Sequence, residues 1–233
     1  MDDKKDNQVD FVSYIAHELR APLASMRWYA EMLLDGVAGQ LTDEQKKIVS
    51  EIYSGDKRLV QFINNLLESV HVDNGKYKIG KEDADIVLLT KNIIEKSKDI
   101  VGKKKLRLNI KSPEKYIVNM DKKSAEFIIG ALIANAINYS NNDNEIDISI
   151  TPPSKEYNSL VFLVKDNGVG ITEDDQKKIF TEMFRGNNTK DKNKEGTGTS
   201  LFVSNKISNL NKWSLSFESK ENAGATFALE IHL

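Results

Sequence analysis

A histidine followed by a glutamate is the first place in the chain where side chains could perform chemistry. His17 and Glu18 lie in a run with helical periodicity, in which successive residues point about 100° apart. His17 therefore points away from the apolar residues Ile15 and Leu19, toward solvent, where a neutral imidazole offers a nitrogen lone pair. Glu18 can accept the ring proton as a general base. Taken alone, the pair is better explained as an ordinary surface histidine beside an acid.

Two later segments contain residue types that bind nucleotides. Asn135 lies near the end of an expected helix, and its amide oxygen is a hard ligand suited to Mg²⁺, although asparagine also simply terminates helices. Asp166 follows a probable buried strand and opens the run Asp166-Asn167-Gly168-Val169-Gly170. Its carboxylate can accept a hydrogen bond from an exocyclic amine such as that of adenine. Gly168 and Gly170 let backbone approach a ring or a phosphate, but many plain strand-to-turn sites look the same.

A third glycine-containing segment, Gly196-Thr197-Gly198, precedes an expected helix that runs through Leu210. A loop of this kind presents free N–H groups to an anion. The segment lacks the Gly-Lys-Ser/Thr of a P-loop, and its spacing excludes a dinucleotide-binding fingerprint. The preceding lysines either steady phosphates or form a solvated charge run. These lysines are Lys190, Lys192 and Lys194.

Composition limits the classes of protein to consider. The chain has 233 residues, a formal net charge of −2 and no cysteine, which excludes disulfides, thiol nucleophiles and cysteine-based zinc sites. A balanced charge gives no general attraction to nucleic acid, so we expect no nucleic-acid partner. No run approaches the roughly 20 apolar residues needed to span a bilayer. We expect a cytoplasmic protein, whose membrane attachment, if any, is through a sensor segment absent from this chain.

Two long helices are expected to carry His17. In the first, a row of apolar residues recurs in steps of three and four, and Gly36 and Gly39 end it. This row comprises Val12, Ile15, Leu19, Pro22, Met26, Tyr29 and Leu33. Thr42 and Gln45 form a capping box that begins the second helix, and Asp73-Asn74-Gly75 ends it. Its row comprises Ile48, Ile52, Leu59, Phe62, Leu66 and Val70. One hairpin over residues 9–75 buries only part of these rows, so we expect a homodimeric four-helix bundle.

The remainder of the chain, residues 81–233, mixes helices and strands without strict alternation. Helices are expected at 85–98 and 121–139, with Asp121 as the N-cap of the second. Strands are expected at 106–110, 116–120, 145–151, 160–165, 213–219 and 226–232. This pattern predicts an α+β fold, an α/β sandwich with helices on one face of a sheet.

In this order, the motifs resemble those of the sensor histidine kinases of two-component systems. The run His17-Glu18-Leu19-Arg20, followed by Pro22, is similar to the phosphoacceptor box on the first helix of that family's dimerisation hairpin. Asn135 matches the family's Mg²⁺-binding asparagine. The resemblance extends from about Val9 to Leu233.

Further motifs of the second part continue the resemblance. The run from Asp166 to Gly170 matches the first glycine box, in which the aspartate reads adenine. Residues 179–185 are similar to the aromatic box before the ATP lid, and Gly196-Thr197-Gly198 resembles the second glycine box. Thr226 stands where related ATPases place a threonine near adenine.

The resemblance implies a Bergerat-type ATP-binding domain, shared with gyrase-like ATPases. It implies ATP and Mg²⁺ as ligands, with Asn138 and Tyr139 also at the nucleotide. His17 would take the γ-phosphoryl group, assisted by Glu18, and pass it to an aspartate on the receiver domain of a response regulator.

Several positions depart from the family. Ala21 stands where a Thr or Asn usually assists dephosphorylation of the partner, so we expect weak phosphatase activity. Ala131 replaces a frequent asparagine, and Asn138 replaces a Lys or His that contacts phosphate, which predicts weaker nucleotide binding.

In the second glycine box, Glu195, Thr199 and Ser200 replace the usual Gly, Leu and Gly. A Cβ at Ser200 interferes if that position needs positive φ, whereas serine fits well if the position begins a helix. An alternative is therefore a degenerate kinase, a dimeric nucleotide- or regulator-binding module with little phosphotransfer. A mechanical gyrase-like ATPase is a third alternative, although it has no need for a phosphoacceptor box.

Overall fold

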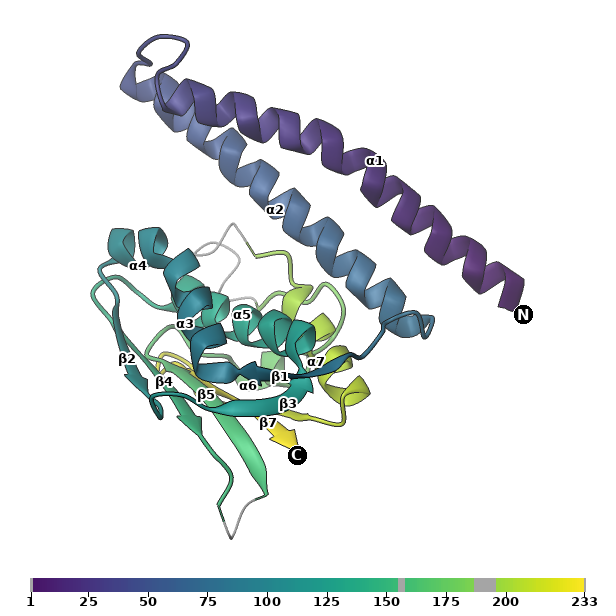
Figure 1. Cartoon of the computed structure of the whole chain (residues 1–233). Helices are drawn as coiled ribbons and strands as arrows, with labels where there is room; N and C mark the ends of the chain where they lie inside the picture. Colours follow the sequence, from purple (N-terminus) through teal and green to yellow (C-terminus); the bar gives the residue numbers. More distant parts are fainter. Residues whose placement is uncertain (1, 155–157, 187–195, 233) are drawn as a thin grey trace. The chain divides into compact units, whose positions relative to one another are not determined.

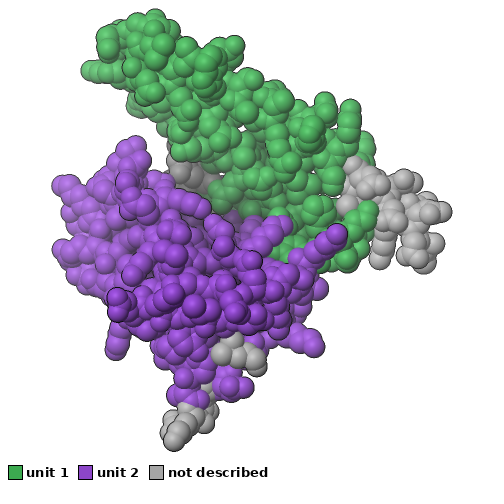
Figure 2. Space-filling view, in the orientation of Figure 1, with its two compact units in different colours: residues 1–77, 195–199 green, residues 78–194, 200–233 purple. Residues whose placement is uncertain are grey.

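The computed structural model describes residues 2–154, 158–186 and 196–232. The chain divides into two compact units (Figure 2). The first contains residues 1–77 and 195–199, and the second contains residues 78–194 and 200–233.

The first unit is an antiparallel helical hairpin (Figure 1). Its helices are α1, Asp2–Leu34, and α2, Asp43–Asp73. Between them Gly36 and Gly39 take φ values of +75° and +108°, which L side chains rarely adopt. The predicted capping box is confirmed, since Thr42 Oγ1 accepts from the Gln45 nitrogen and Gln45 Oε1 accepts from the Thr42 nitrogen.

The face of α1 that packs on α2 differs from the predicted row. The core of the hairpin contains Ala16 and Leu23 of α1 against Ile63 and Leu67 of α2. Most of the predicted row is instead exposed within the chain. Its exposed members are Ile15, Leu19, Pro22, Met26 and Tyr29. The row predicted for the bundle seam is therefore mostly left uncovered by the single hairpin, because α1 is apolar on two neighbouring faces and a different one meets α2.

Three polar pairs also connect α1 to α2. Arg27 Nε donates to Asp56 Oδ2 at 3.1 Å, with the Asp56 side chain buried. The other two pairs are Arg20 with Asn64 and Tyr53 with Glu31. Because the two residues of each pair must lie opposite each other to form the bond, these bonds fix the register of the two helices.

The second unit is a mixed five-stranded sheet with helices on one face (Figure 1). The strand order is β2-β4-β5-β7-β6, in which only the β2–β4 pair is parallel. These strands are β2, Arg107–Lys111; β4, Glu145–Thr151; β5, Ser159–Asp166; β6, Ser214–Ser219; and β7, Ala225–His232. A separate two-stranded sheet pairs β1, Lys81–Asp85, with β3, Ile117–Asp121.

The helices of this unit are α3, Ile86–Lys96; α4, Lys98–Lys104; α5, Lys122–Tyr139; α6, Glu173–Gln176; and α7, Ser200–Leu210. The central helix, α5, begins at the predicted cap, where Asp121 Oδ1 accepts from the Ser124 nitrogen at 2.7 Å. Buried residues alternate along β4, β5 and β7, so one sheet face packs on the helices. The predicted α+β sandwich is confirmed. Strand β1, helix α4 and the single turn α6 were not predicted.

Among the described residues, none of the helices combines the length and the apolar character that crossing a bilayer requires.

Candidate functional site

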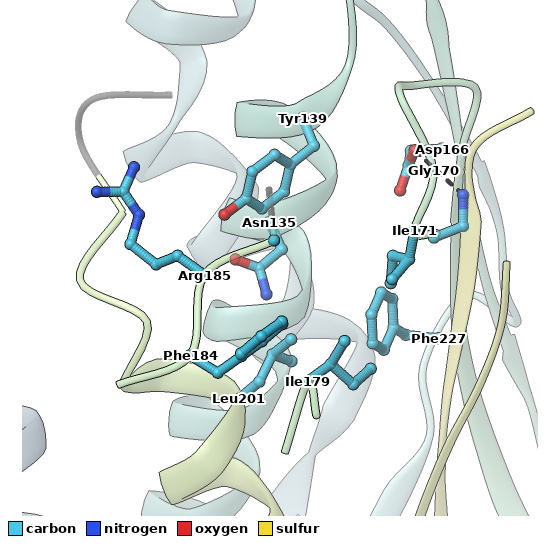
Figure 3. A pocket seen from close by; sticks show the side chains of 12 residues that line it. Asn135, Tyr139, Asp166, Gly170, Ile171, Ile179, Phe184, Arg185, Leu201 and Phe227 are labelled. Carbon is cyan, nitrogen blue, oxygen red and sulfur yellow. Dashed lines mark hydrogen bonds between the residues drawn. The ribbon is translucent and has the colours of Figure 1, made fainter. Parts of the chain in front are cut away.

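The second unit contains a cleft of about 610 Å³ between the end of α5 and the sheet (Figure 3). Figure 3 shows Asn135 and Tyr139 on one side and Asp166, Ile171 and Phe227 on the other. The lining residues are Asn135, Tyr139, Asp166, Gly170, Ile171, Ile179, Phe184, Arg185, Gly186, Leu201, Ala225 and Phe227. Most of this wall is apolar, so the few polar groups on it stand out as candidates for ligand recognition.

Asp166 is the buried acid of the cleft. Its Oδ1 accepts hydrogen bonds from the backbone nitrogens of Gly168, at 2.9 Å, and Ala225, at 3.3 Å. Its Oδ2 has no partner among the described residues. Burial raises the pKa of this carboxyl above its usual 3.8, while the two backbone hydrogen bonds partly oppose that rise. The arrangement leaves one oriented acceptor facing an apolar cleft.

Asn135 and Tyr139 are presented by the last turns of α5. They are one helical turn apart and therefore share a face of the helix. The Asn135 amide has no hydrogen-bond partner in the described part of the chain. An amide oxygen and a phenol thus line the side of the cleft that faces Asp166.

The glycines of the Asp166 loop are needed for packing within the protein. A Cβ on Gly168 would lie 2.3 Å from the Tyr139 carbonyl oxygen, and one on Gly170 would lie 2.0 Å from the Lys220 carbonyl oxygen. Gly170 also has φ of +63°. We expected these glycines to admit a ligand. The structure shows that their first requirement is close contact between backbone segments, which holds the loop against the end of α5.

Several predicted nucleotide-binding residues lie outside the cleft lining. Gly168 packs behind it, and the Asn138 carbonyl accepts a hydrogen bond from Lys104. Thr226 does not line the cleft, whereas its neighbours Ala225 and Phe227 do. Successive side chains of a strand point to opposite faces of the sheet, so Thr226 faces the other side. Thr226 lines a shallower hollow with Lys165 and Glu218.

The sequence prediction also missed part of the lining. Arg185 belongs to the lining, although Figure 3 shows its guanidinium directed away from Asp166 and the sheet, and Phe184, Ile179 and Leu201 add apolar wall. The aromatic motif at residues 179–185 was the sequence feature that pointed to this part of the lining. The lysines at 190, 192 and 194, together with Glu195, lie outside the described residues.

Gly196, Thr197 and Gly198 belong to the first unit and not to the unit that contains the cleft. Gly198 has φ of +71°, so the left-handed position of this segment falls on a glycine. Ser200 is the first residue of α7. Of the two interpretations of Ser200, the structure therefore selects the helix start, where serine is well accommodated.

His17 and Glu18 form an exposed pair on α1. Their side chains are 80% and 59% exposed, and His17 Nδ1 lies 3.5 Å from Glu18 Oε1. The prediction that this imidazole faces solvent is confirmed. Pro22 lies within α1, where its missing N–H leaves the Glu18 carbonyl without its helical donor. The phosphoacceptor candidate is thus an accessible ring beside a carboxylate, on a locally loosened helix.

Comparison with known proteins identifies both parts of the chain. Residues 7–75 match the His Kinase A (phospho-acceptor) domain, and residues 120–233 match the histidine kinase-, DNA gyrase B-, and HSP90-like ATPase family. The sensor protein SrrB of Staphylococcus aureus is 26% identical over 222 residues, which are 95% of this chain and 37% of SrrB. The chain therefore spans just over a third of the length of that relative.

Solved structures agree on the fold. The histidine kinase AdeS of Acinetobacter baumannii gives a TM-score of 0.62 at 23% identity, covering 93% of this chain and 97% of the AdeS chain. Full-length ShkA, solved in complex with AMPPNP, gives 0.71 at 18% identity, covering 95% of this chain and 45% of ShkA. With a phosphoacceptor hairpin followed by an ATPase unit of this kind, the chain belongs to the sensor histidine kinase family.

Proposed function

We propose that this chain catalyses ATP-dependent phosphorylation of its own His17 and then donates the phosphoryl group to an aspartate on a response-regulator receiver domain. Residues 9–75 act as the dimerisation and phosphoacceptor part, and residues 81–233 act as the ATP-binding part. The observation that carries the proposal is the Asp166 carboxylate, whose Oδ1 is fixed by two backbone donors and whose Oδ2 is left for a ligand. Since ATP is a cytoplasmic metabolite, we propose that the chain works in the cytoplasm.

The cleft suits adenine better than a sugar or a peptide. A purine is flat and apolar on its faces, which matches walls such as Ile171 and Phe227. Its exocyclic amine is a donor, which matches the free acceptor on Asp166. Tyr139 and Arg185 lie at the same cleft, where the phenol can donate to the ribose or the phosphates and the guanidinium can pair with phosphate. In our proposal, this guanidinium offsets part of the charge lost at Asn138.

A magnesium ion fits this site only together with the phosphates. Across the residues that the structure describes, no group of three His, Cys, Asp or Glu side chains could hold a metal ion. Asn135 offers one oxygen, and Mg²⁺ commonly takes one or two protein oxygens, with phosphates and waters completing its shell. When bound, the ion neutralises charge on the triphosphate, and Asn135 is the residue of this chain that would hold it.

At His17, we propose that Nε2 is the attacking nitrogen. The Nδ1 atom lies 3.5 Å from Glu18 Oε1, which supports a tautomer in which Nδ1 carries the proton and Nε2 keeps the lone pair. Nε2 forms a bond to the γ-phosphorus as the bond from that phosphorus to the β–γ bridging oxygen breaks, and ADP leaves with that electron pair. Glu18 takes the Nδ1 proton, which keeps the phosphorylated ring neutral. Transfer to the regulator breaks the new N–P bond and forms an acyl phosphate on its aspartate.

We also propose that the chain works as a homodimer. An apolar row on the hairpin is exposed within one chain, including Ile15, Leu19 and Met26 on α1 and Ile48 and Ile52 on α2. Single exposed apolar residues are ordinary, but a row along two helices is typical of a surface that packs on a partner. A second hairpin would cover this row and complete a four-helix bundle. The apolar row that the sequence predicted for a bundle seam thus becomes the proposed seam between subunits.

The experiment that tests the proposal uses the full chain, ATP labelled on the γ-phosphate and Mg²⁺. Acid-labile, base-stable label on the wild type, absent from His17→Ala, is the expected result. Nucleotide binding without label would replace the proposal with the degenerate kinase. Steady hydrolysis unaffected by His17→Ala would indicate a mechanical ATPase. Adding receiver domains one at a time to the labelled protein then tests the second transfer.

A further inference from the structure

The C-terminus of α5 lacks a cap of its own. Helix ends leave four carbonyl groups without intrahelical donors, and these are usually satisfied by a left-handed glycine or by basic residues in the last turn. Here the residue after Tyr139 is Ser140, with an extended backbone, and the last turn contains no basic residue. The end of the helix that carries Asn135 and Tyr139 must therefore be held from elsewhere.

Lys104, more than thirty residues earlier in the chain, supplies the missing donors. Its Nζ lies 2.8 Å from the Ile137 carbonyl oxygen, 2.8 Å from that of Asn138 and 3.1 Å from that of Ser140. An ammonium has three N–H donors, so one side chain satisfies three carbonyls. Its positive charge also lies at the negative end of the helix dipole.

The backbone of Lys104 is tied to the same region. Lys104 is the last residue of α4, and its carbonyl accepts from the Asp143 nitrogen at 2.9 Å. The next strand begins with a bond from the Arg107 nitrogen to the Asn144 carbonyl at 2.9 Å. The backbone that carries this ammonium is therefore itself hydrogen-bonded to the loop following α5. This fixes the position of Lys104 relative to the end of the helix.

The opposite side of the α5 end meets the Asp166 loop. The Tyr139 carbonyl accepts from the Val169 nitrogen at 3.4 Å, and Gly168 leaves no room for a side chain beside it. The last turn of α5 is thus held by hydrogen bonds from Lys104 on one side and from the loop that carries Asp166 on the other. Any movement of this turn changes the separation of Asn135 from Asp166 across the cleft (Figure 3).

We propose that Lys104 is a positioning residue of the nucleotide site, which acts by fixing the last turn of α5. The inference rests on the proposed binding of ATP in this cleft. Lys104 is committed to three backbone carbonyls, so its role is to place Asn135 and Tyr139 and not to hold phosphate.

The test compares Lys104→Met with Lys103→Met in the full chain. Methionine keeps most of the unbranched apolar side chain and removes the donors and the charge. Lys103 is the exposed neighbour on α4, with no contact to the α5 carbonyls. The affinity for ADP is measured by calorimetry at 20 °C, with circular dichroism at the same temperature to confirm that each variant is folded. We expect Lys104→Met to raise the Kd about tenfold, as for other small misplacements of binding groups, and Lys103→Met to leave it unchanged.

A purely structural role would lower the melting temperature without moving the Kd of the folded protein, so an unchanged Kd for Lys104→Met overturns the inference. If that variant is unfolded at 20 °C, Lys104→Gln, which retains two donors, is judged by the same measurement. For Lys104→Gln, a Kd raised about threefold or more supports the inference, and a Kd equal to the wild type overturns it. Failure of the wild type to bind ADP would instead remove the proposed function, so the two failures are distinct.

Discussion

The Oδ1 atom of Asp166 lies 2.9 Å from the backbone nitrogen of Gly168, two residues further along the chain. Together with the bond from the Ala225 nitrogen, this contact decides which carboxylate oxygen faces the cleft. A carboxylate held on one side by two N–H groups cannot rotate to offer a different atom. The acid therefore presents a single acceptor in a fixed direction, which is what recognition of one exocyclic amine requires.

Replacing Asp166 by Asn should abolish most nucleotide affinity while keeping the fold. The amide oxygen is needed by the Gly168 and Ala225 nitrogens, so the NH₂ group must face the cleft. Two donors would then confront each other where adenine places its amine. An unsatisfied buried pair of this kind costs about 2–3 kcal/mol, so the Kd for ADP should rise roughly 30- to 150-fold.

Calorimetry with ADP measures this effect, and Asp174→Asn is the matched control, because Asp174 is an exposed acid on the short α6. The control should bind as the wild type does. Equal affinity in Asp166→Asn would show that the carboxylate does not read the base.

Stability should depend on pH through the same carboxyl. Because its folded-state pKa is raised above 3.8, the native protein holds a proton in a window where the unfolded chain has released it. Stability from this group is therefore present below 3.8 and is lost as pH rises through the raised value. In urea unfolding at stepped pH, the wild type should lose stability relative to Asp166→Asn across this window. If the wild type instead gained unfolding free energy relative to Asp166→Asn as the pH rises, the raised pKa of Asp166 would be contradicted.

Glu18 should control the rate of phosphorylation without affecting nucleotide binding. Removing a general base at a proton transfer typically slows the reaction 10²- to 10⁴-fold, so Glu18→Gln should slow labelling of His17 by about that factor. The rate is followed in single turnover at saturating ATP, beside an unchanged Kd for ADP. Glu51→Gln, an exposed glutamate on α2, serves as the control and should label normally.

Gly168→Ala should destabilise the second unit even without nucleotide. The added Cβ would meet a backbone oxygen at 2.3 Å, and backbone cannot move aside cheaply. We expect a loss of about 2 kcal/mol in urea unfolding, typical of overpacking. Gly102→Ala is the contrasting change, because nothing lies within 4 Å of its Cβ and it is in a helix. That variant should gain up to about 1 kcal/mol. Similar stabilities for both variants would refute the packing role.

Charge on the exposed row of the hairpin should separate the proposed dimer. Ile52 is 54% exposed in one chain, and Ile52→Asp would place a carboxylate in the seam between hairpins. Light scattering after size exclusion should show monomers at concentrations where the wild type is dimeric. Val37→Asp, at a position 68% exposed in the connecting loop, should remain dimeric. Dimers of Ile52→Asp would place the interface elsewhere.

The sequence predicted local elements where each one carries its own signal. Strand β4 was predicted with the bounds that the structure shows, because its apolar residues alternate cleanly from Glu145 to Thr151. The caps at Thr42 and Asp121 depend on neighbouring residues only. Strand β1, Lys81–Asp85, has no such alternation, and its pairing with β3 creates it.

The cleft was less predictable because its lining depends on register and on distant contacts. The expected strand began at Thr226, whereas β7 begins at Ala225, and the motif alone did not say which of the two side chains faces the cleft. Lys104 has no motif around it, and its role follows only from the folding of α4 beside the end of α5. On α1, two apolar faces competed, and only the position of α2 decides between Ala16 and Ile15.

The central place of β7 in the sheet also has a consequence for biosynthesis. β7 lies between β5 and β6, although it is translated after both. On the ribosome, α1 and α2 can pair early, whereas β5 must wait for more than sixty residues before its neighbour emerges. Ala225 and Phe227 belong to that late strand and form part of the cleft wall. A nascent chain therefore has no complete binding surface for a nucleotide until β7 has left the exit tunnel.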